Sequence, residues 1–268
     1  MPTISGLRRR GYTANALHKF ILSLGVAKRE AISDFNHLEH YLREDLNLIA
    51  SRVMCVLNPI KLIIENYPEN KVEFLDAENN PENKHDGSRK IPFSRELYIE
   101  REDFMEAPPK KFFRLSIGKE VRLKHAYYIK CTDFIKNNDG EIIEIKCTYD
   151  PLTKGGWSND GRKVKGTIHW VSSKHAIEGE VRLYDRLFNK ENPMEHSKGE
   201  NFTSNINSNS IQTIRGAKLE PYLKKIDFNQ KLQFLRIGYF VFDKNTNKEK
   251  LIFNQTTALR SNWEKNTP

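Results

Sequence analysis

The sequence predicts a mainly β protein that begins with a helical part and continues into closed antiparallel β-barrels. Apolar residues in the first 50 positions recur at helical spacing, whereas later apolar residues alternate at period two or form short runs. Turn signals rich in asparagine, glycine and proline separate those runs. Many short strands with regular turns and few helices are typical of barrels.

The helical part contains two amphipathic segments. Thr13 is the expected N-cap of the first segment, which ends at Gly25, and Ser33 is the expected N-cap of the second. Two helices with a Gly-containing turn could also form a DNA-binding helix-turn-helix. The linker 26–32 is long for such a turn, however, and the second helix is acidic where a DNA reader needs positive charge. We therefore interpret the pair as a subdomain that packs on another part of the protein.

The segments after the helices read as strands and loops. The expected strands are Val53–Leu57, Lys61–Glu65, Arg95–Glu100, Glu120–Cys131, Glu141–Thr148, Lys163–Val171, Glu180–Phe188, Lys231–Phe242 and Leu251–Asn254. Two polar segments with few apolar residues, Asn70–Ser88 and Asn189–Ser210, are expected to be exposed loops.

Charge and cysteine content limit the classes of function. The chain has 44 Lys and Arg against 35 Asp and Glu, and this net charge of +9 favours a polyanionic partner. Cys55, Cys131 and Cys147 form no CxxC pair, which indicates buried reduced thiols rather than metal ligands. No apolar run reaches membrane-spanning length, and the N-terminus lacks the features of a secretion signal. We expect a cytoplasmic protein without a membrane partner.

The sequence contains none of the common catalytic motifs. A Gly-rich phosphate loop, GxSxG and HExxH are all absent. His37 and His40 lie three apart on one helix face, but no third metal ligand accompanies them. This chain alone is therefore not expected to be an enzyme, and no metal site or catalytic residue is expected in it.

Three of the expected strands carry a basic face, which is the chemistry of RNA binding. Single-stranded RNA is recognised by stacking bases on aromatic or guanidinium planes and by hydrogen bonds to base edges. Cations and aromatic residues share one face in each strand: Arg122, Lys124, Tyr128 and Lys130; Lys163, Lys165 and His169; and Arg182, Tyr184 and Arg186. A solvated outer face is the alternative for any single strand.

The chain closely resembles the glutaminyl-tRNA synthetases over essentially its whole length. The matching segments, in order, are Met1–Thr13, Leu42–Leu46, Ile64–Tyr67, Tyr98–Phe104, Gly118–Leu123, Cys147–Asp150, Gly161–Ala176, Glu180–Phe188, Gln233–Phe240 and Phe253–Thr256. Met1 matches an internal methionine of the family pattern. The resemblance therefore implies the C-terminal, RNA-reading part of a bacterial glutamine–tRNA ligase, which joins glutamine to its tRNA using ATP with magnesium.

The resemblance also implies a domain organisation. Residues 1–51 would be a helical subdomain that contacts the tRNA stem. Residues 52–100 with 185–268 would form a proximal β-barrel, and residues 101–184 a distal one. Such barrels are related in fold to a ribosomal protein that binds 5S RNA. The dinucleotide-fold catalytic domain, with its HIGH-type and KMSKS-type motifs, would precede residue 1 and bind the ATP, because neither motif occurs here.

The family's anticodon-reading residues map onto this chain one by one. The middle base would be met by Arg52, Gln233 and Arg236, the third by Arg114, and the first by Arg122 and Lys124, with Asn262 as a further contact. Gln233 and Arg236 have opposite strand parity, so a bulge or bend is needed for both to reach one base. Lys124 replaces a more usual arginine and so loses the planar two-pronged donor. Arg8, Arg9, Arg10, Arg162, Lys163 and Lys165 are interpreted as phosphate contacts.

Other partners and related functions remain open from the sequence. The expected partners are the glutamine tRNA and the missing catalytic domain, and the protein is expected to be a monomer. A close alternative is the same region of an archaeal- or eukaryotic-type glutamyl-tRNA synthetase, whose tRNA shares the middle anticodon base. A more distant alternative is a stand-alone module that binds ribosomal RNA.

Overall fold

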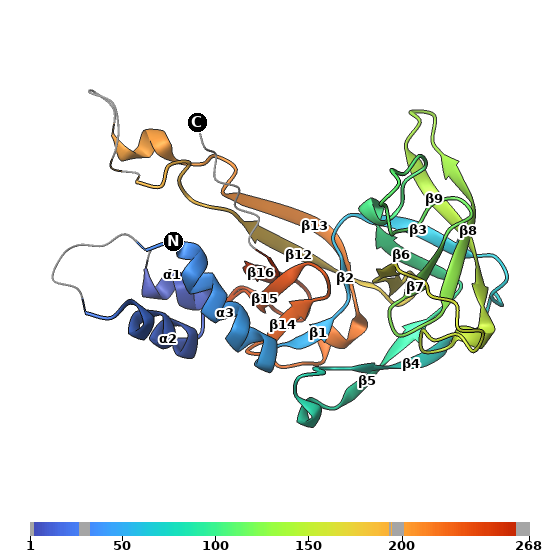
Figure 1. Ribbon diagram of the computed structural model, residues 1–268, viewed down its shortest axis with the longest axis horizontal. Helices are drawn as coiled ribbons and strands as arrows, with labels where there is room; N and C mark the ends of the chain where they lie inside the picture. Colours follow the sequence, from blue (N-terminus) through green and yellow to red (C-terminus); the bar gives the residue numbers. More distant parts are fainter. Residues whose placement is uncertain (1–2, 27–32, 193, 195–200, 261–268) are drawn as a thin grey trace.

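The computed structural model describes residues 3–26, 33–192, 194 and 201–260. Three helices at one end of the molecule lie beside a seven-stranded sheet, and a second seven-stranded sheet forms the other end (Figure 1). The expected mainly β fold with helices at the N-terminus and two barrel-like sheets is confirmed.

The helices are α1 (Ile4–Arg9), α2 (Ala14–Leu24) and α3 (Phe35–Ile49). The Thr13 side chain accepts a hydrogen bond from the Ala16 N–H, and Gly25 ends α2 in the left-handed region at φ 66°. Both boundaries of α2 are as expected. The expected cap Ser33 is wrong, because Asp34 accepts the hydrogen bond from the Asn36 N–H. A carboxylate caps as well as a hydroxyl, and it also interacts favourably with the helix dipole.

The first sheet lies beside the helices. Its order is β1-β14-β15-β16-β12-β13-β2, with β1 Ser51–Val53, β2 Cys55–Val56, β12 Ile177–Tyr184, β13 Ile211–Leu219, β14 Lys231–Phe234, β15 Gly238–Phe242 and β16 Leu251–Ala258. Phe234, Phe240 and Phe253 are fully buried in its core. Tyr239 is buried among the apolar faces of α2 and α3, so this sheet holds the helices against its outer side.

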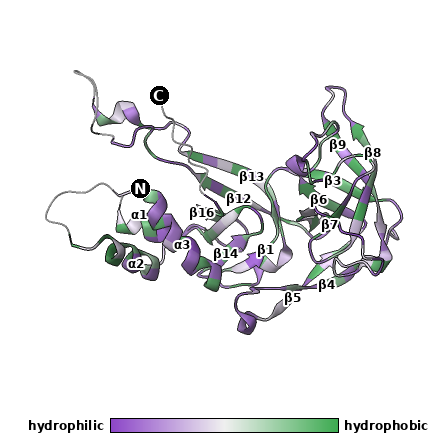
Figure 2. Ribbon diagram, in the orientation of Figure 1, coloured by the Kyte–Doolittle hydropathy of each residue, from purple (hydrophilic) through white to green (hydrophobic). Residues whose placement is uncertain are grey.

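The second sheet encloses the larger core. Its order is β10-β7-β8-β9-β3-β6-β11, with β3 Pro59–Ile64, β6 Glu96–Glu100, β7 Glu120–Leu123, β8 Tyr128–Lys136, β9 Ile142–Asp150, β10 Thr167–Ile168 and β11 Val171–Ser172. A two-stranded ribbon of β4 (Glu73–Glu78) and β5 (Ser88–Phe93) contributes Leu75, Ile91 and Phe93 to this core. Green apolar segments line the strands of this sheet in Figure 2. Short 3₁₀ helices are Lys84–Asp86, Arg101–Asp103, Pro151–Thr153, Phe202–Asn205 and Pro221–Lys224.

The strand pairing divides the chain differently from the expected domain boundaries. Strands β3 and β6, which were expected in the proximal barrel of residues 52–100 and 185–268, belong to the second sheet, where β3 pairs in parallel with β9. Strand β12, expected in the distal barrel of residues 101–184, pairs with β13 and β16 in the first sheet. Alternation shows which residues face a core, but it does not show which distant strand is the partner.

Two expected continuous strands are hairpins. Glu120–Cys131 turns between β7 and β8, and Lys231–Phe242 turns between β14 and β15. The turns contain His125 at φ 63° and Arg236 at φ 69°, the two non-glycine residues with positive φ in the described ranges. Neither turn has a glycine or asparagine at that position, so the sequence gives no local signal for it. The chain bends between Gln233 and Arg236, and the contact of both residues with one base stays a prediction.

The expected exposed loop Asn70–Ser88 contains strand β4, and strands β5 and β13 were not expected at all. Strand β4 lies in that loop with Leu75 and Ala77 buried, and β13 pairs with β12 in a long hairpin. Strands β4 and β13 have polar sequences because many of their side chains are exposed to solvent.

Candidate nucleic-acid interface

Arg52 and Gln233 lie side by side, as their expected shared role requires. They are direct partners in the parallel pairing of β1 with β14. Arg52 Nη2 donates to Asn47 Oδ1 at 2.9 Å, while its Nε is buried without a hydrogen-bond partner among the described residues. Gln233 is buried. A buried donor without a partner is costly unless a ligand satisfies it, so this position is suited to receive a base edge.

Arg236 occupies a different place, at the junction of the two sheets. Its guanidinium donates to both Asp103 carboxylate oxygens, at 2.5 and 2.6 Å, and Asp103 is only 1% exposed. Arg114 approaches the same carboxylate at 3.4 Å through Nε, and its Nη1 donates to the Glu102 carbonyl. Asp103 therefore holds together the two arginines expected at the middle and third anticodon positions.

The same junction includes a histidine and a second carboxylate. His169 lies between Arg236 and Glu100, with Nδ1 at 3.2 Å from Arg236 Nη1 and Nε2 at 3.3 Å from Glu100 Oε1. Burial raises the pKa of Glu100, but His169 and the backbone N–H groups of Leu57 and Asn58 outweigh it and lower that pKa below its ordinary value. Glu100 thus stays ionised and fixes the His169 ring.

Arg122 and Lys124 project from the end of β7. Arg122 Nε donates to Thr167 Oγ1 at 3.0 Å and Nη1 to the Gly156 carbonyl at 3.3 Å. Burial and then the positive charges of Arg122 and Arg52 lower the pKa of Lys124. Burial, with the charge of Lys124, lowers the pKa of His125 to about 4. Glu78 raises the pKa of Lys124, and Glu82 lies 3.7 Å from Arg52, so acidic residues offset part of this charge. We call Arg52, Arg122 and Lys124 the cation cluster, and the positive charge it keeps would favour a polyanion.

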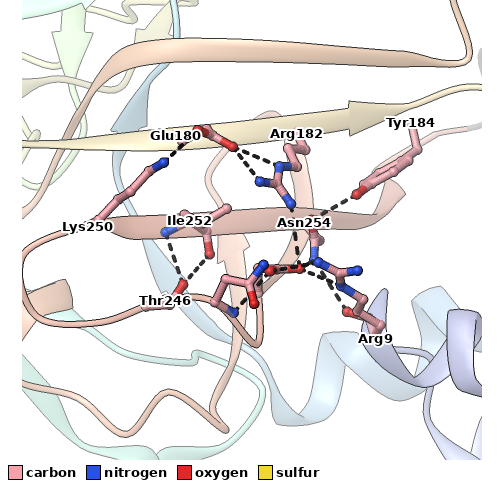
Figure 3. A network of polar contacts seen from close by, with 10 residues as sticks. Arg9, Glu180, Arg182, Tyr184, Thr246, Lys250, Ile252 and Asn254 are labelled. Atoms are coloured by element: carbon pink, nitrogen blue, oxygen red, sulfur yellow. Dashed lines mark hydrogen bonds and ion pairs between the residues drawn. The ribbon is translucent and has the colours of Figure 1, made fainter.

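Two of the expected phosphate contacts anchor α1 to the first sheet. Arg9 makes a two-pronged ion pair with Asp243, at 2.8 and 3.0 Å, and Asn254 donates to the same carboxylate (Figure 3). Arg10 Nη2 donates to the Thr256 carbonyl, and its guanidinium lies over the Tyr184 ring. These contacts give Arg9 and Arg10 a structural role within the chain, and their contact with phosphate stays a prediction.

The remaining residues that were expected to contact phosphate differ in whether their charged groups are free to bind it. Arg162 lies 2.5 Å from both Asp150 and Asp160 and 3.3 Å from Glu120, and these carboxylates raise the pKa of its guanidinium. Arg8, Lys163 and Lys165 are exposed. Among the described residues, the Arg8 guanidinium and the Lys163 ammonium have no partner, and Lys165 lies over the Phe113 ring. Asn262 lies outside the described residues.

Asp103 was not recognised from the sequence as part of this interface, although it lies inside the matching segment Tyr98–Phe104. His169 was expected on an exposed basic strand face, but it is only 2% exposed. The sequence does show an acidic residue, Asp103, in a matching segment. It does not show that Asp103 contacts Arg236, because the two residues meet only where the two sheets touch.

The described residues contain no group of three His, Cys, Asp or Glu side chains placed to hold a metal ion. His40 lies 3.3 Å from Glu44, and His37 packs against Phe20 and Tyr41. The three cysteines are buried and free. None of the described helices is long and apolar enough to cross a membrane.

Comparison with known proteins agrees with the geometry. Two family models, both described as "tRNA synthetases class I (E and Q), anti-codon binding domain", match residues 50–150 and 167–243. The glutamine–tRNA ligase of Nitrobacter winogradskyi is 49% identical over 99% of this chain and 47% of its own length. That of Clostridium kluyveri is 48% identical over 98% and 47%, and that of Rhodopirellula baltica 50% identical over 99% and 44%. The chain thus spans about half the length of the curated relatives it matches.

Proposed function

We propose that this chain, which belongs to the anticodon-binding domains of the class I tRNA synthetases for glutamate and glutamine, reads the anticodon of the glutamine tRNA. Arg52 and Gln233 recognise the middle base together with Arg236, Arg114 recognises the third, and Arg122 and Lys124 recognise the first. The observation that carries this assignment is the pairing of Arg52 with Gln233, with a buried Arg52 Nε free to donate.

The chemistry of these groups suits base edges. An arginine offers two parallel donors, and a glutamine amide offers one donor and one acceptor. Each good contact contributes about 1–3 kcal/mol of discrimination against a wrong base. The Arg52, Arg122 and Lys124 cation cluster adds attraction to the loop phosphates without selecting its sequence.

The intact protein extends this function. We propose that it is a cytoplasmic, monomeric glutamine–tRNA ligase whose ATP and magnesium bind in the part of the relatives that this chain does not span. The chain alone supplies binding and not the ligation chemistry. Aminoacylation by the 268-residue chain by itself would contradict this division of labour.

The test is the affinity of this chain for tRNAs that differ only in the three anticodon bases. Each substitution in the glutamine anticodon is expected to weaken binding by roughly 5- to 150-fold, the range for one lost base contact. A preference for the glutamate tRNA, which differs at the third position, would assign the chain to the glutamyl enzymes instead. Indifference to all anticodon changes would contradict base reading and favour a ribosomal RNA-binding module.

Changing Lys163 to alanine tests a phosphate contact separately from base reading. We expect all tRNAs to bind more weakly by a similar factor, and the dependence of log affinity on log salt to become shallower by ~0.7–0.9. Lys248, an exposed lysine between β15 and β16, provides a matched alanine control whose salt slope is expected to stay unchanged. An unchanged slope for Lys163→Ala would show that this lysine does not contact phosphate.

A further inference from the structure

An exposed tryptophan stands beside the cation cluster. Trp157 is 75% exposed in the loop that leads from β9 to β10, although tryptophan is one of the most costly residues to leave in water. The Arg122 guanidinium lies 5.9 Å from the centre of its ring. An exposed aromatic ring beside a guanidinium is a combination that binds unstacked nucleobases.

The loop is held firmly in the position that presents this ring. Gly155 and Gly156 both have positive φ, at 84° and 85°, which other residues rarely adopt. A Cβ on Gly156 would lie 2.6 Å from Arg122 Cδ, so the backbone rests directly on the arginine side chain. Arg122 also donates to the Gly156 carbonyl, and its Nε is fixed by Thr167. The arginine therefore supports the loop and the indole together.

We propose that Trp157 is a stacking platform for a nucleobase of the bound RNA. One side of the indole faces the Arg122 guanidinium, and the exposed side receives a base that has left the loop stack. The inference rests on the proposed anticodon-reading function and adds a residue that selects for an unstacked base of any identity. In this arrangement Arg122, which is held by Thr167 and the Gly156 carbonyl, orients the indole ring and also places a positive charge beside it.

The first experiment measures affinity for an RNA hairpin that carries the glutamine anticodon loop. Trp157→Ala is expected to weaken binding about tenfold, because one base–aromatic stack contributes ~1–3 kcal/mol. Trp157→Phe is expected to stay within about twofold of the unchanged chain, since a phenyl ring still stacks. Phe74→Ala, which removes an aromatic ring 60% exposed on β4, is the matched control and is expected to have no effect.

The second experiment distinguishes stacking from base reading. Hairpins with altered anticodon bases are expected to lose the same factor on Trp157→Ala, because every base has a π-face. Tryptophan fluorescence of the unchanged chain is expected to fall on hairpin binding, and the Trp157→Phe chain should lose most of that decrease. Anticodon-dependent binding that persists undiminished in Trp157→Ala would overturn this inference while leaving the proposed function intact. Anticodon-independent binding by the unchanged chain would instead contradict the proposed function.

Discussion

Replacing Arg236 by alanine is expected to lower the free energy of unfolding by about 3 kcal/mol and to abolish discrimination at the middle anticodon base. The stability loss arises because Asp103, 1% exposed, would keep its charge without the two-pronged partner that now compensates it. Arg114 remains near the same carboxylate at 3.4 Å and limits the loss. Urea unfolding and tRNA affinity measure the two effects.

A double variant separates the scaffold role of Arg236 from base reading. Asp103→Asn with Arg236→Met removes the buried charge and its partner together, so most of the stability should return. If Arg236 reads the base, this double variant still binds cognate tRNA and a tRNA altered at the middle base almost equally. If the double variant regains both its stability and its preference for the cognate tRNA, Arg236 has a structural role only. Arg101→Ala, which removes an exposed neighbouring charge and its hydrogen bond to the Ile142 carbonyl, serves as the control for an arginine that does not contact Asp103.

The pairing of Arg236 with Asp103 modifies the recognition mechanism implied by the resemblance. Arg52 and Gln233 are neighbours within the first sheet, whereas Arg236 reaches a carboxylate in the 3₁₀ helix between β6 and β7 of the second sheet. A base bound by all three would therefore lie where the two sheets meet. Because Arg114 shares Asp103, the expected middle-base and third-base residues are coupled through one carboxylate, and their substitutions should not be additive.

The sequence predicted local features of the fold better than its long-range pairing. Thr13 and Gly25 bound α2 as expected because capping depends on neighbouring residues. The placement of β3 and β12 in the opposite sheets from those expected could not be read from alternation, which is the same whichever partner a strand has. Arg236 adopts positive φ with no local signal, because its tertiary ion pair with Asp103 holds it there.

The candidate site shows the same division. Arg52 and Gln233 were assigned from matching segments, and their direct pairing agrees with a shared role. Arg9 and Arg162 read as free cations in the sequence, yet each is engaged by carboxylates distant or nearby along the chain. The sequence shows that a residue is basic, but it does not show which carboxylate the fold places beside it. Only the structure shows which of these basic side chains are free to contact RNA.

Replacing Glu220 by alanine is expected to have the largest effect on stability, about 3–5 kcal/mol. The Glu220 side chain is only 3% exposed and accepts from Arg89 Nε and Nη2, both at 2.7 Å, and from the Met54 N–H at 2.7 Å. Its removal leaves the buried Arg89 charge and one backbone donor unsatisfied. The measurement is urea unfolding. The matched control is Glu178→Ala, which breaks the exposed pair with Lys218 and should cost less than ~1 kcal/mol.

The same substitution should also weaken RNA binding, because Glu220 positions Arg52 through a chain of contacts. Arg89 Nη1 donates to Asn79 Oδ1, and the Asn79 carbonyl accepts from the Arg52 N–H at 2.6 Å. Replacing Glu220 and Arg89 together by methionine removes the unpaired charge and should restore most of the stability, although the Met54 N–H still lacks its acceptor and Asn79 loses its arginine donor. If the stable double variant discriminates the middle anticodon base as well as the unchanged chain does, this ion pair contributes to folding and not to the placement of Arg52.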